Sequence, residues 1–538
     1  MASTLVPPTS SYMASKRRKR TPNWEEFYRN GYPTDVIVIE DDTPPPPASD
    51  GPLADAKRQF YSTAAPPDGR RGRDNYTLIG SPNVSLFDLG GGLTSPTTAL
   101  KRQRDAAAHY AATSTAAVVP VPPLPERAPI TVHDVPTDVD STLGKKRKLE
   151  YAAPKKPVCK AKDVVVQAIT DPFVPREKLD DDDGHYIIVP NSEFTSRYTI
   201  TKLLGQGTFG KVVEAYDHQK RSSCAIKIIR AVQKYRDASK IELRVLSTLS
   251  MHDQQNVNRC IHLRDCFDYR NHICIVTDLL GISVFDFLKS NSFVPFPASH
   301  IQQFAKQLLT SVMFLHELNL IHTDLKPENI LLVNSAYDTY PYNERGIETR
   351  KVLKDTTIHL IDFGSATFQD EYHSSVVSTR HYRAPEIILS MGWSFPCDMW
   401  SIGCILVEFF TGEALFQTHD NLEHLAMMET IVGRPFDRAQ SKLAGRQARK
   451  YFLRNGKLDY PNTQTSKTSK KYVKAMKTLD EMIPVDKAPF YREFVDLLRR
   501  IFVYNPEERL TAKDALNHAW FRQDPPLEDF EQAAQALH

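Results

Sequence analysis

The eight residues from His322 to Asn329, HTDLKPEN, combine groups that could act on a hydroxyl, a phosphate and a metal ion. Asp324 is the candidate base that orients a substrate hydroxyl, and Lys326 lies where it could neutralise a moving phosphoryl group. Asn329 offers an amide oxygen to Mg²⁺, and Asp362, which opens an Asp-Phe-Gly triplet, offers a carboxylate. Each residue alone would fit a polar surface loop. Together they supply what phosphoryl transfer requires, provided that matching parts precede them in order.

A glycine-rich turn lies upstream, between two stretches with the apolar alternation of strands. Leu204 leads into Gly205, Gly207 and Gly210, and the chain continues through Val212 in the β-type run KVVEAY. Glycines let a backbone approach phosphates with no Cβ in the way. A dinucleotide-binding fold would require a helix directly after the glycines, which this sequence lacks. The pattern therefore predicts a phosphate-binding turn between two strands.

An apolar stretch at 224–227 ends in Lys227, which can hold the α- and β-phosphates of a nucleotide if a carboxylate positions it. Glu242 is the candidate partner, because Ile241, Val245 and Leu249 repeat at helical spacing beside it. Either residue alone is more typical of a solvated surface. Their order relative to the downstream motifs favours a pair.

Two apolar segments are expected to support the site as helices. One begins near Ser299, a candidate N-cap, and its stripe consists of Ile301, Phe304, Leu308, Val312 and Leu315. The other, MWSIGCILVEFF at 399–410, is typical of a buried helix and is too short to span a bilayer.

The order of these motifs, completed by Ala384-Pro385-Glu386, resembles the signature of eukaryotic protein kinases over residues 198–521. The resemblance implies an α+β bilobal fold with a β-rich N-lobe, a helical C-lobe, and ATP with Mg²⁺ between them. It also implies structural roles for Asp398 as a brace of the catalytic loop and for a Glu386–Arg509 pair.

The same resemblance implies an adenine pocket. Its apolar walls are expected to be Val212, Ala225 and Leu331. The backbone groups of Asp278 and Leu280 are expected to form the hinge hydrogen bonds, and Thr277 occupies the gatekeeper position. Threonine is smaller than the phenylalanine that is frequent at this position in related kinases. We therefore expect a deeper pocket behind ATP. Asp286 is expected at the cleft mouth, where it could contact ribose or a substrate arginine. A simple helix-start carboxylate is an equally good interpretation of Asp286.

The segment EHLAMME at 423–429 resembles the signature of the LAMMER kinases, also called the Clk or Cdc2-like family, with Thr430 in place of the signature arginine. The resemblance implies a dual-specificity enzyme, arginine/serine-rich splicing factors as substrates, and work largely in the nucleus. Taken from its residues, the segment is an amphipathic helix with Leu425, Met428 and Ile431 facing inward. We therefore expect it to maintain the fold and to perform no chemistry.

Thr323 stands where most kinases have an arginine beside the catalytic aspartate. That arginine is a buried charge commonly satisfied by an activation-loop phosphate. Its absence predicts basal activity without an upstream activating kinase. Autophosphorylation on Tyr372, Ser374, Ser375 or Thr379 is a weaker expectation, because hydroxyls are common in loops.

Composition separates the first 180 residues from the rest, because they hold 23 of the 37 prolines and few apolar periodic segments. We expect a disordered regulatory arm at 1–180, a family-type lead-in at 181–197, the kinase domain at 198–521 and a short tail at 522–538. The seven irregularly spaced cysteines suggest reduced thiols in a nuclear or cytosolic protein. No secretory signal or 18-residue apolar run is found, so no membrane association is expected.

The arm carries basic runs at 16–20, 101–104, 145–148 and 155–162, which are typical of nuclear import signals. Nonspecific RNA affinity and simple solubilising charge are the alternatives, although a net charge of +3 argues against wholesale nucleic-acid binding. The run Val36–Asp42, VIVIEDD, resembles a SUMO-interacting motif that would add a strand to a partner sheet. An incidental apolar patch explains it equally well.

Two other kinds of protein are alternatives to an active kinase. A pseudokinase scaffold would lack at least one phosphate or metal residue, and none is missing. An interaction protein dominated by its arm would use the kinase fold only as a platform.

Overall fold

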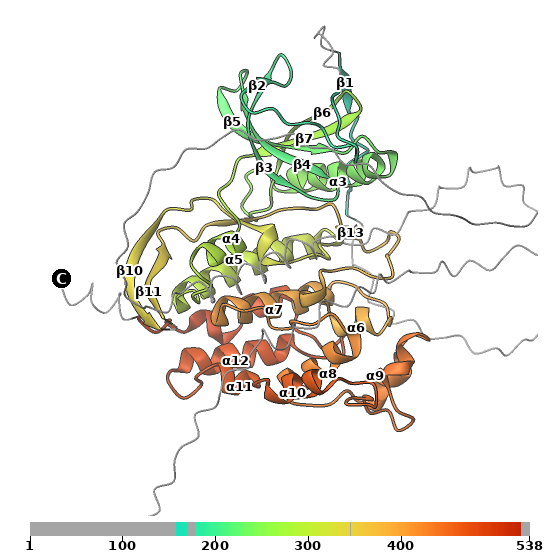
Figure 1. The fold of residues 1–538 in the computed structure, drawn as a ribbon, viewed down its shortest axis with the longest axis vertical. Helices are drawn as coiled ribbons and strands as arrows, with labels where there is room; N and C mark the ends of the chain where they lie inside the picture. The colour runs from blue at the N-terminus through green and yellow to red at the C-terminus, as the bar shows by residue number, and fades with distance from the viewer. Residues whose placement is uncertain (1–157, 171–177, 345, 529–538) are drawn as a thin grey trace, which may run out of the picture. The chain divides into compact units, whose positions relative to one another are not determined.

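A seven-stranded sheet forms the first part of the described chain (Figure 1). The computed structural model of the protein describes residues 158–170, 178–344 and 346–528. The strand order is β1-β6-β7-β5-β4-β3-β2, and neighbours are antiparallel except for the parallel pair β1 and β6. The strands are β1 (Gln167–Ile169), β2 (Ser192–Glu193), β3 (Tyr198–Gln206), β4 (Gly210–Asp217), β5 (Ser222–Ile229), β6 (Leu263–Tyr269) and β7 (His272–Asp278). The helix α3 (Gln233–His252) packs against β5, β6 and β7.

Alternation along the central strands creates two different faces. In β4, Val213 and Ala215 are fully buried, and in β5 the same holds for Cys224 and Ile226. These side chains share one core with Tyr198 and the aromatic residues of β6. The intervening residues of β4 and β5 point to the opposite face, where the site lies.

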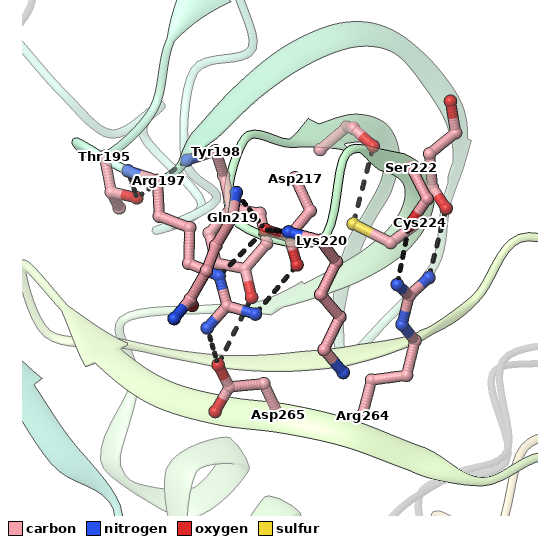
Figure 2. Close-up of polar contacts among 12 residues, drawn as sticks. Thr195, Arg197, Tyr198, Asp217, Gln219, Lys220, Ser222, Cys224, Arg264 and Asp265 are labelled. Carbon is pink, nitrogen blue, oxygen red and sulfur yellow. Dashed lines mark hydrogen bonds and ion pairs between the residues drawn. The ribbon is translucent and has the colours of Figure 1, made fainter.

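A partly buried network of ion pairs links three strands of this sheet, as Figure 2 shows. Arg197, just before β3, donates to both carboxylate oxygens of Asp217 at 2.9 and 2.7 Å and to Asp265 at 2.6 Å. The Asp217 side chain is fully buried. The Arg197 guanidinium beside it lowers the pKa of Asp217 to about 2. One arginine thereby joins the start of β3 to the end of β4 and to β6.

The second part of the described chain is mainly helical (Figure 1). Its helices are α4 (Val284–Ser290), α5 (Ala298–Glu317), α6 (Pro385–Ile388), α7 (Pro396–Thr411), α8 (Asn421–Val432), α9 (Arg438–Leu443), α10 (Lys467–Ala475), α11 (Leu479–Met482), α12 (Pro489–Ile501) and α13 (Ala512–Leu516). Helix α7 is buried over almost its whole length, as its apolar composition predicts, and it packs against α5 and α12. The N-cap position of α5 is Pro297, not Ser299, because the helix already begins at Ala298.

Short strands hold the loops between these helices. They are β8 (Leu320–Ile321), β9 (Ile330–Leu332), β12 (Ile358–Leu360) and β13 (Thr367–Phe368), and they pair as β8 with β13 and β9 with β12. The insertion between Asn329 and Asp362 forms a hairpin of β10 (Tyr337–Glu344) and β11 (Ile347–Leu353). The segment EHLAMME lies within α8, where Leu425, Met428 and Ile431 are buried as expected.

Residues 158–170, predicted from composition to belong to the disordered arm, form contacts with the folded chain. They include β1 and a hydrogen bond from the Ala161 N–H to the Thr248 hydroxyl on α3. The earlier basic runs and the run Val36–Asp42 lie outside the described residues. All seven cysteines are free, as expected, and five of them are buried. Within the described residues, no helix is long and apolar enough to cross a membrane.

Candidate active site

The buried carboxylate of Asp398, at the start of α7, holds the backbone of the loop that carries Asp324. Its two oxygens accept hydrogen bonds from the backbone N–H groups of His322 at 3.0 Å and Thr323 at 2.9 Å. Thr323 has φ of +70°, which is unfavourable for a β-branched residue and costs roughly 1–3 kcal/mol. The two hydrogen bonds offset this strain and confirm the brace that was expected of Asp398.

Asp324 is oriented by two neighbours. Lys326 donates to its Oδ2 at 2.8 Å, and Thr379 donates to its Oδ1 through the backbone N–H at 2.8 Å and the hydroxyl at 2.7 Å. Burial alone would raise the pKa of Asp324, but the Lys326 ammonium and these hydrogen bonds lower it below its usual value. Asp324 is therefore an ionised, fixed acceptor that can orient a substrate hydroxyl and take its proton.

The candidate metal ligands Asn329 and Asp362 are brought together by their backbones. The N–H of Ile361 donates to the Asn329 carbonyl at 2.9 Å, and the Asn329 side-chain amide donates to the Asp324 carbonyl at 2.9 Å. This orientation leaves the amide oxygen of Asn329 as the ligand atom. One amide oxygen and one carboxylate suit Mg²⁺, which takes few protein ligands and completes its shell with phosphate and water. When bound there, Mg²⁺ would offset the negative charge of phosphate oxygens.

Lys227 lies between two carboxylates. Its ammonium donates to Glu242 at 2.8 and 3.0 Å and to Asp362 at 3.1 Å. Burial alone would lower the pKa of Lys227, but the two carboxylates raise it above its usual value. The Lys227 charge in turn lowers the pKa of Asp362 to about 2. The expected pair between the strand lysine and the helix glutamate is therefore present, and it also contacts the metal-binding carboxylate.

Helix α3 presents Glu242 to Lys227 as predicted, but one apolar residue of the predicted stripe lies outside the buried face. Ile241 is 42% exposed, whereas Glu242, Val245, Leu246 and Leu249 are buried. Adjacent residues on a helix are about 100° apart, so the face centred on Glu242 excludes Ile241. The predicted stripe was wrong at this residue. Its remaining members are buried, and Glu242 faces Lys227.

The glycines of the turn between β3 and β4 have two different tasks. A Cβ on Gly205 or Gly207 would meet no atom within 4 Å, so open space lies beside the backbone there, as phosphate binding requires. A Cβ on Gly210 would instead lie 2.1 Å from the Ile228 carbonyl oxygen. Gly210 therefore permits the close pairing of β4 with β5.

Most of the expected adenine-pocket residues lie on neighbouring strands of the sheet, and Leu331 lies on β9. Ala225 pairs with Thr277, and Val212 pairs with Lys227, so these side chains share one face of the sheet. Leu331 lies on β9, which is tied to the chain after Leu280 by a hydrogen bond from the Gly281 N–H to the Leu332 carbonyl at 2.7 Å. Val212, Ala225, Thr277, Leu280 and Leu331 are half-buried, while Leu204 and Asp278 are exposed.

The segment before Ala384 folds onto the catalytic loop at Thr323. The Thr323 hydroxyl donates to the Ser365 carbonyl at 2.9 Å, and the Ser378 hydroxyl donates to the Thr323 carbonyl. A neutral, satisfied threonine thus occupies the position. Among the residues expected as phosphorylation sites, Tyr372 is 74% exposed, whereas Thr379 is buried against Asp324 and is therefore a poor acceptor.

Two residues of the site were missed in the sequence analysis. Thr379 was considered only as a phosphorylation site, although it lies five residues before Ala384 and thus at a fixed distance from the Ala-Pro-Glu triplet. Glu328 was passed over inside HTDLKPEN, although its side chain is half-buried beside the catalytic residues. For both Thr379 and Glu328, the fixed position relative to a kinase motif could have indicated a role in the site.

A family model described as protein kinase domain matches residues 198–521. The chain is 56% identical to the dual specificity protein kinase lkh1 of Schizosaccharomyces pombe over 70% of this chain and 54% of that protein. It is 48% identical to the serine/threonine-protein kinase AFC1 of Arabidopsis thaliana, over 64% of this chain and 75% of the relative. It is also 46% identical to the dual specificity protein kinase CLK4 of Homo sapiens, over 64% and 70%. A crystal structure of a kinase domain is 33% identical, with a TM-score of 0.58 over 63% of this chain and all of the other.

A sheet that carries a glycine turn and a lysine, together with a helical part that carries a candidate base and two candidate metal ligands, is the arrangement of a protein kinase. The chain belongs to the protein kinase family and, within it, to the LAMMER or Clk branch. Its match spans only about half of the fission yeast relative.

Proposed function

We propose that this protein is an ATP- and Mg²⁺-dependent kinase of dual specificity. It phosphorylates serine and threonine in arginine/serine-rich splicing regulators and autophosphorylates on tyrosine. The relatives lkh1 and CLK4 are named dual specificity kinases, and Tyr372 offers an exposed tyrosine in the chain's own activation segment. The proposed preference for arginine in the substrate rests on one observation, the unsatisfied carboxylate oxygen of Glu328.

Glu328 places one unsatisfied carboxylate oxygen beside the catalytic residues. Its Oε2 is buried and has no hydrogen-bond partner among the described residues. Burial raises the pKa of Glu328 to about 7, against the opposing effect of the Lys326 ammonium, and the charges of Asp324 and Asp286 raise it further. A buried carboxylate oxygen without a hydrogen bond is unfavourable, and an arginine guanidinium is a group that can satisfy it. A substrate with arginine close to the reacting serine supplies that group.

Asp286 stands in the first turn of α4, where its carboxylate accepts a hydrogen bond from the Ser283 hydroxyl at 2.7 Å. The contact favours the interpretation of Asp286 as a helix-start carboxylate. Its negative charge still adds to the field around Glu328. We therefore assign the direct arginine contact to Glu328.

The test is a comparison of Glu328→Gln with the wild-type protein on peptides of the arginine/serine type. Losing a charge-assisted hydrogen bond costs about 1.5–3 kcal/mol, so we expect KM for the peptide to rise by about tenfold or more and kcat to change little. With a peptide whose arginines are replaced by alanine, the two proteins should have the same KM. An array with proline-directed and acidic peptides, and Asp324→Asn as the inactive control, completes the design. Equal KM for the arginine peptide would refute the proposed contact.

The pKa of Glu328 adds a pH dependence. Only the ionised carboxylate attracts a guanidinium, and in the free protein half of it is protonated at a pH of about 7. We expect kcat/KM for the arginine peptide to fall as pH decreases through about 7, and this limb of the profile to vanish in Glu328→Gln.

We also propose a nuclear location, supported by the basic runs of the sequence. Of the run at 155–162, Lys160 is engaged in ion pairs, so import receptors would rely on Lys145–Lys148 and the remaining lysines. Loss of nuclear accumulation on neutralising Lys145–Lys148 in a fluorescent fusion tests this. For Val36–Asp42, a labelled peptide of residues 30–50 that fails to bind SUMO would dismiss the proposed contact.

A further inference from the structure

Residues 158–170, which we call the strap, attach to α3 at two points. The backbone N–H of Ala161 donates to the Thr248 hydroxyl at 3.0 Å, and the ring nitrogen Nε2 of His252 lies 2.9 Å from the Cys159 carbonyl. Val158, Val164 and Val166 pack against the main core. The strap ends with β1, which pairs with β6. It therefore follows the helix that carries Glu242.

Lys160 connects the strap to the segment that follows Asp362-Phe363-Gly364. Its ammonium lies 2.6 Å from Asp370 and 3.0 Å from Glu371, and 4.3 Å from the centroid of the Phe368 ring. The Lys160 side chain is only 25% exposed. Phe368 is fully buried and lies in β13, which pairs with β8 immediately before the catalytic loop. Lys160 thus contacts a part of the chain that pairs with the strand leading into the catalytic loop.

Glu371 receives a second cation, from α3 itself. Arg244 donates to both of its carboxylate oxygens, at 2.8 and 2.7 Å, and stands 5.7 Å from the Phe368 ring. Arg244 lies two residues after Glu242 on the same helix, so its position and that of Glu242 move together. Without Lys160, Arg244 would be the one cation left, among the described residues, to form ion pairs with the acidic pair of Asp370 and Glu371. Lys160 balances the charge of this contact and links the strap, α3 and the activation segment.

We propose that Lys160 is a positioning residue for phosphoryl transfer. By holding Glu371, to which Arg244 binds, and by securing the strap along α3, it keeps Glu242 within reach of Lys227. The contact takes the place of the activation-loop phosphate, for which Thr323 leaves no receptor arginine. The inference rests on the phosphoryl-transfer activity of the proposed function, but it does not depend on which protein is the substrate.

The experiment compares three variants of the full chain with the wild type. Lys160→Met keeps the length and the apolar contact with Phe368 but removes the charge, Lys160→Arg keeps the charge, and Lys178→Met is the matched control. Lys178 forms an exposed ion pair with Asp182, with 64% of the lysine side chain accessible. Each protein is assayed for ATP turnover with a generic protein acceptor, and amide hydrogen exchange is followed in α3 and α7.

We expect Lys160→Met to lower kcat by about three- to tenfold, because the competent position of α3 becomes less populated. KM for ATP should stay within about twofold, because the strands and hinge around the adenine do not contact Lys160. Amides of α3 should exchange faster while those of α7 do not. Lys160→Arg should restore kcat, and Lys178→Met should match the wild type.

An inactive wild-type protein would refute the proposed function and not this inference. With an active wild type, an unchanged kcat in Lys160→Met would overturn the positioning role. So would a failure of Lys160→Arg to restore the rate. If Lys160→Met is also less stable, equal acceleration of exchange in α3 and α7 would show a purely structural role and overturn the inference. Acceleration confined to α3 would support it.

Discussion

At the scale of single residues, Thr323 shows how one substitution changes the requirements of a site. The position is 1% exposed, its hydroxyl is bonded to the Ser365 carbonyl, and its backbone is held by Asp398. An arginine there would be a buried cation in need of an anion. Threonine removes both the buried charge and the requirement for an anion. The strained φ of Thr323 is maintained by the carboxylate of Asp398.

We therefore expect the purified protein to keep its activity, to within about twofold, after complete phosphatase treatment. Loss of most of the activity, measured against a mock-treated sample, would contradict the assignment. Thr323→Arg should lower the free energy of unfolding by about 3 kcal/mol, because it buries an unpaired charge. Denaturant unfolding measures this change, and Thr323→Val, which removes only the hydroxyl, is its control, with an expected cost of about 1 kcal/mol.

Thr379 illustrates a residue that acts through another. Its hydroxyl donates to Asp324 and accepts from Lys326 at 3.2 Å, so it fixes the relative position of base and lysine. Thr379→Val keeps the shape and removes the hydroxyl, and we expect kcat to fall by about tenfold with little change in KM for ATP. Thr379→Ser retains the hydroxyl and should stay within a few-fold of wild type. Steady-state kinetics decide, and equal rates for Val and Ser would speak against the role.

At the scale of elements, the sheet depends on contacts between distant strands more than on any strand alone. Arg197 joins β3, β4 and β6 through Asp217 and Asp265, and Gly210 lets β4 approach the Ile228 carbonyl. The order of these strands places Lys227 on the face of the sheet that is turned toward Glu242. Because Glu242 comes from α3, the geometry of the site is a property of the sheet and the helix together.

Arg197→Ala should lower the free energy of unfolding by about 3 kcal/mol at neutral pH, because it leaves Asp217 as a buried, unpaired charge. The depressed pKa of Asp217, about 2 against 3.8, means that its stabilising contribution is present above pH 4 and is lost as pH falls towards 2. The integrated effect is about 2 kcal/mol. Denaturant unfolding of Arg197→Ala should show a weaker loss of stability over this acid range.

Lys202→Ala is the control for that measurement. Lys202 pairs with Glu214 at 3.0 Å on the same strands, but 62% of its side chain is exposed, so we expect a change below about 0.5 kcal/mol. Equal destabilisation by the two substitutions would show that burial of Asp217 is not the cause.

At the scale of the whole molecule, the kinase fold and the pairing of Lys227 with Glu242 could be predicted because each motif carries its own local pattern and the motifs occur in a known order. The predicted burial of Ile241 on α3 was wrong, because Val245 and Leu249 fit a helical stripe that begins at Ile241 as well as one that begins at Glu242. The strap could not be predicted. Lys160 meets Asp370 across 210 positions in the sequence, and no periodicity records such a contact. Composition alone assigned the strap to the arm.

The remaining alternative at this scale is a protein whose arm functions while the kinase fold serves as a platform. Asp362→Ala separates the two, because it removes a metal ligand and leaves Glu242 to pair with Lys227. We expect ATP turnover to fall by about a thousandfold or more while the protein stays folded. Asp338→Ala, which removes an exposed carboxylate of the β10–β11 hairpin, should keep wild-type turnover. If cells that carry Asp362→Ala keep the phenotype of the wild type, the arm and not phosphoryl transfer performs the main function. If they match cells lacking the protein, catalysis does.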